Sequence, residues 1–107
     1  MASNSFQFTE TAKRDLDEIL RYIRVDLANQ GSARAFFKAF FSRIDDVCAF
    51  PESCETVDNE LLKRKDVRKM IVGNYLAYYV FEKEKRMLTI LRIVYGKRNL
   101  EEIIKLL

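Results

Sequence analysis

The sequence predicts a small α+β domain in which a helical hairpin packs on one face of a mostly antiparallel sheet. In the first half, two stretches repeat apolar residues at the spacing of amphipathic helices. In the second half, three stretches are rich in β-forming residues and are separated by turn signals. With one more strand before the helices, the order is strand, helix, helix, strand, strand, strand, then a short C-terminal helix.

The first two elements are a short strand and a helix. Residues 5–9 alternate polar and apolar side chains, which is typical of a strand with one buried face. An apolar stripe follows at spacings of three and four residues: Ala12, Leu16, Ile19, Ile23 and Leu27. This spacing predicts an amphipathic helix of about five turns. Thr9 or Thr11 is suited to cap it.

The second helix is predicted over the phenylalanine-rich segment that ends before Pro51. Asn29-Gln30-Gly31 interrupts the first pattern, so we expect Gly31 to take the left-handed position and Ser32 to cap the next helix. The apolar stripe that follows comprises Phe36, Phe37, Phe40, Phe41, Ile44, Val47 and Cys48. Because these aromatic residues recur at helical spacing, we interpret them as core rather than as a stacking platform for bases.

The second half predicts three strands after a long connection over residues 52–66. We expect the strands at 67–72, 75–81 and 87–95. Gly73-Asn74 is a hairpin signal, and the charged run 82–86 separates the last two strands. Asn99 is suited to cap a last helix from Leu100 to Leu107.

Length and composition predict one domain over residues 1–107 and restrict its chemistry. The chain has no histidine and two cysteines, which excludes a Ser-His-Asp triad, a Cys-His pair and a four-thiolate zinc site. No apolar run reaches the roughly 18–20 residues of a membrane helix, and the polar N-terminus does not resemble a signal peptide. We therefore expect a cytoplasmic protein that uses no cofactor or metal and does not contact the membrane.

The charge is distributed unevenly along the chain. Residues 1–60 carry seven basic and eleven acidic side chains, a net charge of −4. Residues 61–107 carry twelve basic and five acidic side chains, a net charge of +7. A basic second half either attracts phosphate groups or an acidic protein partner, or forms a solvated surface.

Several motifs, taken in order, resemble the RelE/ParE superfamily of bacterial toxins from type II toxin–antitoxin modules. The segment 8–19 (FTETAKRDLDEI) is similar to the first strand and helix of that family, and Phe50-Pro51 to the end of its second helix. Val67-Arg68-Lys69 and the segment 73–79 are similar to its second and third strands. The segment 90–100 (ILRIVYGKRNL) is similar to its last strand and exit, so the resemblance covers nearly the whole chain.

The resemblance implies a growth-inhibiting toxin that a cognate antitoxin keeps silent until the antitoxin is degraded. RelE-like members cut mRNA, usually on the ribosome, whereas ParE-like members poison DNA gyrase and are not nucleases. We expect a metal-independent endoribonuclease that cuts mRNA, because the Gly-Lys-Arg exit at 96–98 and the basic second half are retained. Gyrase poisoning is the alternative, since the first helices look at least as much like ParE and the nuclease residues are partly lost.

For RNA cleavage, the resemblance places the site on the basic strands and the exit of the last strand. We expect three catalytic residues: Arg98, which matches the Gly-Lys-Arg exit, Arg68 on the second strand, and Tyr95, which replaces a tyrosine of some relatives. The substrate-binding set is Lys69, Tyr75, Arg92 and Lys97. Tyr75 occupies the place of an arginine in RelE-like nucleases, and Ile104 lies near where some of them carry a tyrosine.

Attack by the RNA 2′-OH needs groups that transfer protons and cations that hold the developing phosphate charge. An unperturbed Tyr or Lys has a pKa near 10, so such a site requires strong tuning. Structural interpretations stand beside the catalytic ones. Arg68 and Lys69 are adjacent and point to opposite sheet faces, so at most one faces a common site. Arg92 is either a ligand or a paired structural charge, and we interpret Tyr78 and Tyr79 as packing residues.

Overall fold

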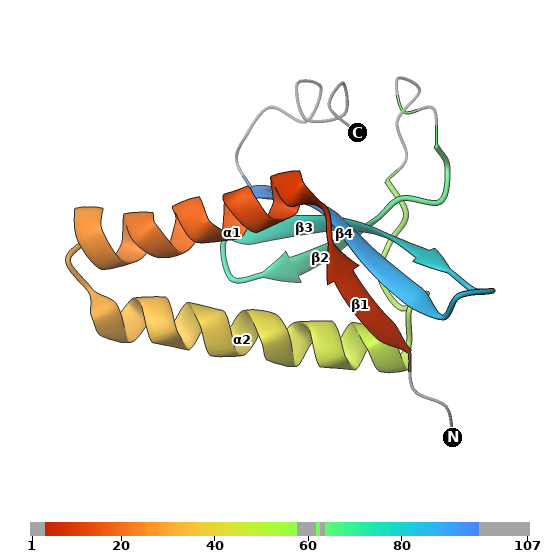
Figure 1. Ribbon diagram of the computed structural model, residues 1–107, viewed down its shortest axis with the longest axis horizontal. Coiled ribbons are helices and arrows are strands. Elements are labelled where there is room, and N and C mark those ends of the chain that lie inside the picture. The colour runs from red at the N-terminus through yellow and green to blue at the C-terminus, as the bar shows by residue number, and fades with distance from the viewer. Residues whose placement is uncertain (1–3, 58–61, 63, 97–107) are drawn as a thin grey trace.

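The computed structural model describes residues 4–57, 62 and 64–96, and it has the predicted element order up to the last strand (Figure 1). Strand β1 (Ser5–Phe8) leads into helix α1 (Glu10–Arg21), the π-helical segment η1 (Tyr22–Asp26) and helix α2 (Gln30–Ala49). Strands β2 (Arg68–Val72), β3 (Tyr75–Glu82) and β4 (Met87–Tyr95) follow. The two helices form a hairpin that covers one face of the sheet, which confirms the predicted fold class.

Helix α1 begins at a residue that the sequence favours as its cap. The backbone of Thr9 is extended, and its Oγ1 accepts a hydrogen bond from the N–H of Ala12 at 3.1 Å. This contact satisfies one of the N–H groups that a helix start leaves free. At the other end the helix widens into η1, where the N–H of Leu27 donates to the carbonyl of Tyr22 at 3.1 Å. The apolar periodicity does not predict this π-helical segment.

The turn between the helices differs from the sequence prediction. Gly31 lies inside α2 rather than at a left-handed position, and Ser32 does not cap the helix. Instead, Ala28 takes the left-handed conformation, with φ of 49°. The side chain of Asn29 caps α2 by accepting a hydrogen bond from the N–H of Ser32 at 3.0 Å. Asn is as good a cap as Ser, so the helix begins earlier than predicted.

The sheet is mixed and has the strand order β1-β4-β3-β2. Strand β1 is parallel to β4, and the other two pairings are antiparallel. The β2–β3 hairpin turns at Gly73, whose φ of 59° is the left-handed conformation that the Gly-Asn signal predicts. Between β3 and β4, Tyr79 pairs with Ile90 and Tyr78 pairs with Arg92, so Leu91 is an extra residue that forms a β-bulge.

Apolar side chains are buried on both faces of the sheet. On the helix side, Phe40 of α2 packs in one cluster with Tyr79 and Ile90. On the other face, Tyr78 packs with side chains from the connection before β2: Val57, Leu62 and Val67. This connection also extends the sheet, because the N–H of Val57 donates to the carbonyl of Val67 at 2.8 Å. The sequence predicts a long connection here but not its pairing with β2.

The burial of the two central tyrosines confirms their interpretation as packing residues. Tyr78 and Tyr79 are 1% and 0% exposed. The predicted C-terminal helix, Leu100 to Leu107, lies outside the described residues. In the part of the chain that the structure describes, no helix is both long and apolar enough to span a membrane.

Candidate functional site

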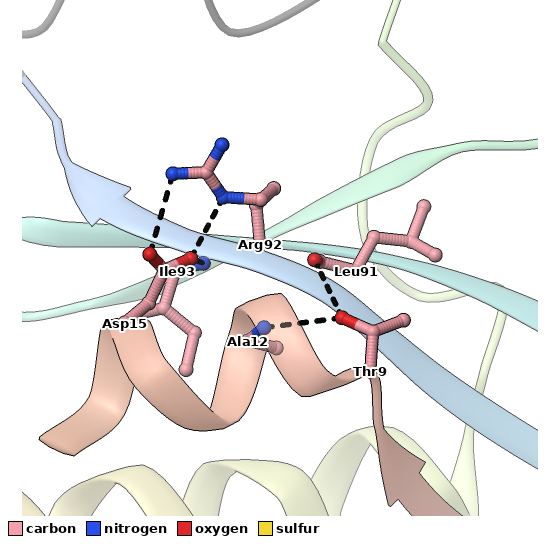
Figure 2. A network of polar contacts seen from close by, with 6 residues as sticks. All are labelled: Thr9, Ala12, Asp15, Leu91, Arg92 and Ile93. Atoms are coloured by element: carbon pink, nitrogen blue, oxygen red, sulfur yellow. Dashed lines mark hydrogen bonds and ion pairs between the residues drawn. The ribbon is translucent and has the colours of Figure 1, made fainter. Parts of the chain in front are cut away.

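The open edge of β4 is held by the side chains of Asp15 of α1 and of Thr9, the residue that caps this helix (Figure 2). Strand β1 pairs with β4 only as far as Ile90. Beyond that point, Thr9 Oγ1 donates to the carbonyl of Leu91 at 2.9 Å. One Asp15 carboxylate oxygen accepts from the Ile93 N–H at 2.9 Å and from Arg92 Nε at 2.8 Å, and the other accepts from Arg92 Nη2 at 3.3 Å. Helix side chains thus replace the strand that is missing from this edge.

The Asp15–Arg92 ion pair explains why a charged residue lies within an apolar strand. The side chains of Asp15 and Arg92 are only 12% and 11% exposed. A guanidinium that is removed from water in this way is stabilised by a bidentate carboxylate partner. Of the two interpretations that the sequence left open for Arg92, the paired structural charge is therefore the one observed.

Arg68 anchors the chain that follows α2. Its Nη1 donates to the carbonyl oxygens of Cys54 at 2.6 Å and Glu52 at 3.2 Å. Beside it, the hydroxyl of Tyr79 donates to the carbonyl of Pro51 at 2.8 Å. Burial raises the pKa of the Tyr79 phenol well above its usual value, as does a hydrogen bond with Cys54. Arg68 is thus already engaged by backbone acceptors.

Lys69 lies on the other face of the sheet from Arg68, as the predicted alternation requires. Arg68 pairs with Tyr79, which packs on the helix side, whereas Lys69 pairs with Tyr78 on the opposite face. Lys69 Nζ lies 3.9 Å from a carboxylate oxygen of Glu55. These two adjacent cations therefore do not face a common site.

Tyr75 and Tyr95 lie together at a cleft of about 670 Å³ between α1–η1 and the ends of β3 and β4. Their ring centroids are 5.7 Å apart, and Tyr22 of η1 lines the same cleft. Burial raises the pKa of Tyr75, with smaller contributions from Tyr22 and Tyr95. Asp15 and Glu18 are the charged residues that line this cleft within the described ranges. The described part of the cleft is therefore aromatic and acidic rather than basic.

The described members of the predicted nuclease set thus do not converge. Arg68 pairs with Tyr79, four residues along β3 from Tyr75, a separation of about 13 Å. Arg92 is bound by Asp15, and Tyr75 and Tyr95 line the acidic cleft. Lys97 and Arg98 lie outside the described residues.

Sequence reasoning missed Asp15, Glu18 and Tyr22 as neighbours of this cleft. A signal for Asp15 was present, because it lies between Ala12 and Leu16 on the apolar side of the helix. A carboxylate there needs a cationic partner, and Arg92 in its apolar strand has the complementary requirement. No comparable signal marked Tyr22, since its place in the cleft depends on the π-helical segment.

Both cysteines, Cys48 and Cys54, are buried, and neither forms a disulfide bond. Burial and the nearby Asp45 carboxylate raise the pKa of the Cys48 thiol. Cys54 Sγ accepts a hydrogen bond from Arg43 Nη2 at 3.6 Å. Among the residues that the structure places, no three Cys, Asp or Glu side chains are grouped as metal ligands.

A helical hairpin on a four-stranded mixed sheet, with β1 parallel to β4, is a RelE-like fold, shared with solved toxin chains. One is a chain of the chromosomal ParDE toxin–antitoxin system of P. aeruginosa, with 18% identity and a TM-score of 0.69, covering 89% of this chain and 98% of that chain. The RelBE2 toxin–antitoxin complex of Mycobacterium tuberculosis contains another, with 21% identity, a TM-score of 0.61, and coverage of 88% and 99%. The isolated RelE toxin of E. coli has 15% identity, a TM-score of 0.59, and coverage of 98% and 100%.

At these identities the structural likeness shows the fold, and the sequence itself shows the family. Residues 6–100 match the family model described as the ParE toxin of the type II toxin–antitoxin system parDE. Comparison with curated proteins gave no significant match. The chain belongs to the ParE toxin family of type II toxin–antitoxin systems, within the RelE/ParE superfamily.

Proposed function

We propose that the free chain arrests bacterial growth by poisoning DNA gyrase and does not cut RNA. The observation that carries this proposal is that two cations of the predicted nuclease set, Arg68 from the catalytic residues and Arg92 from the substrate-binding residues, are engaged by other groups of the chain. Arg68 Nη1 donates to two backbone carbonyls and the Arg92 guanidinium is bound by Asp15, so both cations already have acceptors within the fold. A gyrase poison needs no such groups, and the match to the ParE family supports this target.

Cleavage of mRNA, in association with the ribosome, is the second candidate. The sequence retains Gly-Lys-Arg at 96–98, directly after the last strand. Tyr95 lies just before this motif and is 45% exposed, beside Tyr75. In this candidate, Arg98 stabilises the phosphate charge, Tyr95 takes part in proton transfer, and Lys97 binds substrate.

We also propose that a cognate antitoxin protein binds and silences the chain in the cytoplasm. Solved chains of the same fold come from toxin–antitoxin complexes, namely the RelBE2 and RelBE assemblies. An antitoxin segment that adds a helix or strand beside the sheet fits the recognition modes of extended peptides. The net charge of +7 in the second half favours a partner with acidic and apolar residues.

The target is tested by inducing the chain without its partner in bacterial cells and following DNA and protein synthesis separately over minutes. We expect DNA synthesis to fall first, gyrase–DNA cleavage complexes to accumulate and mRNA to remain intact. Early loss of protein synthesis with new mRNA 5′ ends would refute the gyrase target. Arg98→Ala should then abolish the cuts, while Lys85→Ala, an exposed cation in the β3–β4 turn, should preserve them.

A further inference from the structure

The cleft between α1–η1 and the strand ends combines exposed aromatic rings with a carboxylate at its rim. Its walls carry three tyrosines, of which Tyr22 and Tyr95 are 48% and 45% exposed. Its rim carries Glu18, an exposed carboxylate with which no described residue forms an ion pair. Asp15, the other carboxylate, is already bound by Arg92. Glu18 therefore gives the cleft a negative charge that no ion pair among the described residues engages.

This combination fits a cation with an apolar stem. Tyrosine rings attract a guanidinium or ammonium group that lies within about 6 Å of the ring. The rings of Tyr75 and Tyr95 pack against each other, with centroids 5.7 Å apart and an angle of 59° between them, so a cation in the cleft lies against a ring face rather than between the two rings. Ile19 and Ile93 line the same cleft and offer an apolar surface to a methylene chain. Phosphate is disfavoured there, because both charged side chains that line the described cleft are carboxylates.

We propose that this cleft binds an arginine side chain presented by a protein partner. A planar guanidinium stacks on an aromatic ring and donates two hydrogen bonds to one carboxylate, here that of Glu18, whereas an ammonium group provides neither match. A volume of about 670 Å³ exceeds one side chain and accommodates the flanking residues of a peptide as well. Charge complementarity thus selects a basic segment here, although the basic second half of the chain favours acidic contacts elsewhere.

The test uses the ¹⁵N-labelled full chain and two probes that differ only in charge. N-acetyl-arginine amide carries the guanidinium, and N-acetyl-citrulline amide replaces it with a neutral urea of the same shape. We expect the arginine probe to shift the amide signals of Glu18, Tyr75 and Tyr95 in NMR titrations. The citrulline probe should bind about fivefold more weakly or not at all. Equal binding of both probes, or shifts confined to other surfaces, would overturn the proposal.

Matched variants assign the binding to the cleft. Glu18→Gln and Tyr95→Leu should each weaken the arginine probe about three- to fivefold. Asp17→Asn removes an exposed charge from the same helix outside this cleft, and it should have no effect. If Asp17→Asn weakens binding of the arginine probe as much as Glu18→Gln does, the probe responds only to the overall charge of the helix, and the site is refuted. Because Glu18 and Asp17 are both exposed, neither variant is expected to unfold the chain.

The same titration tests whether an arginine of this chain, rather than one of a partner, binds in the cleft. Arg98 follows Tyr95 by three residues in the sequence. Binding of the arginine probe that occurs only in the Arg98→Ala variant would overturn the assignment to a partner in favour of this internal residue. Binding of equal strength in the original chain and in Arg98→Ala supports the partner. Neither result depends on whether gyrase is the target.

Discussion

Removing the carboxylate of Asp15 should be among the most damaging single changes in the described part of this fold. Asp15→Ala removes three hydrogen bonds at 2.8, 2.9 and 3.3 Å, two of them from a guanidinium. It leaves Arg92 charged and 11% exposed, and it leaves the Ile93 N–H without its partner. Breaking a buried pair in this way costs about 3–5 kcal/mol. Against a domain stability of about 5–15 kcal/mol, this loss is a large fraction.

A double-mutant cycle separates the ion pair from the backbone contact. Replacing Arg92 by Met removes the buried charge, so Asp15→Ala should be less harmful in the Arg92→Met background by about 1–3 kcal/mol. The loss of stability that Asp15→Ala still causes in the Arg92→Met background reports the Ile93 N–H that has lost its acceptor, and we expect it to be about 1–3 kcal/mol. Urea unfolding at pH 7, followed by far-ultraviolet circular dichroism, gives each free energy.

Two results would refute this reasoning about the β4 edge. One is an Asp15→Ala variant whose free energy of unfolding lies within about 1 kcal/mol of the original chain, which is the range of a surface salt bridge. The other is strict additivity in the cycle, which would mean that Asp15 and Arg92 do not interact in solution. Asp17→Asn, an exposed change on the same helix, is the control and should leave the unfolding midpoint unchanged.

Three further predictions concern the loop anchor, alkaline pH and the interhelical turn. Arg68→Ala should lower the free energy of unfolding by about 1.5–3 kcal/mol, whereas Lys69→Ala, which loses a 3.9 Å pair, should change it by less than about 1 kcal/mol in urea titrations. The pKa of Tyr79 is raised on folding, so its contribution is complete below the unfolded pKa near 10 and is lost as pH rises above it; Tyr79→Phe should flatten the fall in stability measured above about pH 10. Ala28→Gly should raise the free energy of unfolding by about 0.5–1 kcal/mol in thermal melts, because φ is 49°, and a decrease would contradict the assigned conformation.

The regular elements could be predicted because their signals are local. The stripe from Ala12 to Ile23 fixes the face of the first helix, and Gly73-Asn74 fixes a hairpin. The interhelical turn could not be assigned with the same success, because Asn29 and Ser32, three residues apart, are both good caps.

The candidate site was less predictable because its contacts join distant parts of the sequence. Asp15 and Arg92 are 77 residues apart in the sequence. Each is a charged residue in an apolar pattern, and the ion pair can be inferred only when the two are considered together. A basic residue on a strand indicates phosphate binding until its partner is known. Arg68 illustrates this, since its acceptors are backbone carbonyls that carry no sequence signature.

The parallel pairing of β1 with β4 also determines when this protein can complete its fold. Ser5 pairs with Met87, so the chain must close a loop of 82 residues before the first strand has a neighbour. Contacts of such high sequence separation are formed late and slow the folding of small domains. At about 5–20 residues per second, synthesis of the intervening chain takes roughly 4–16 s. During that interval the nascent toxin lacks its finished sheet, and a partner already present in the cell has time to meet it first.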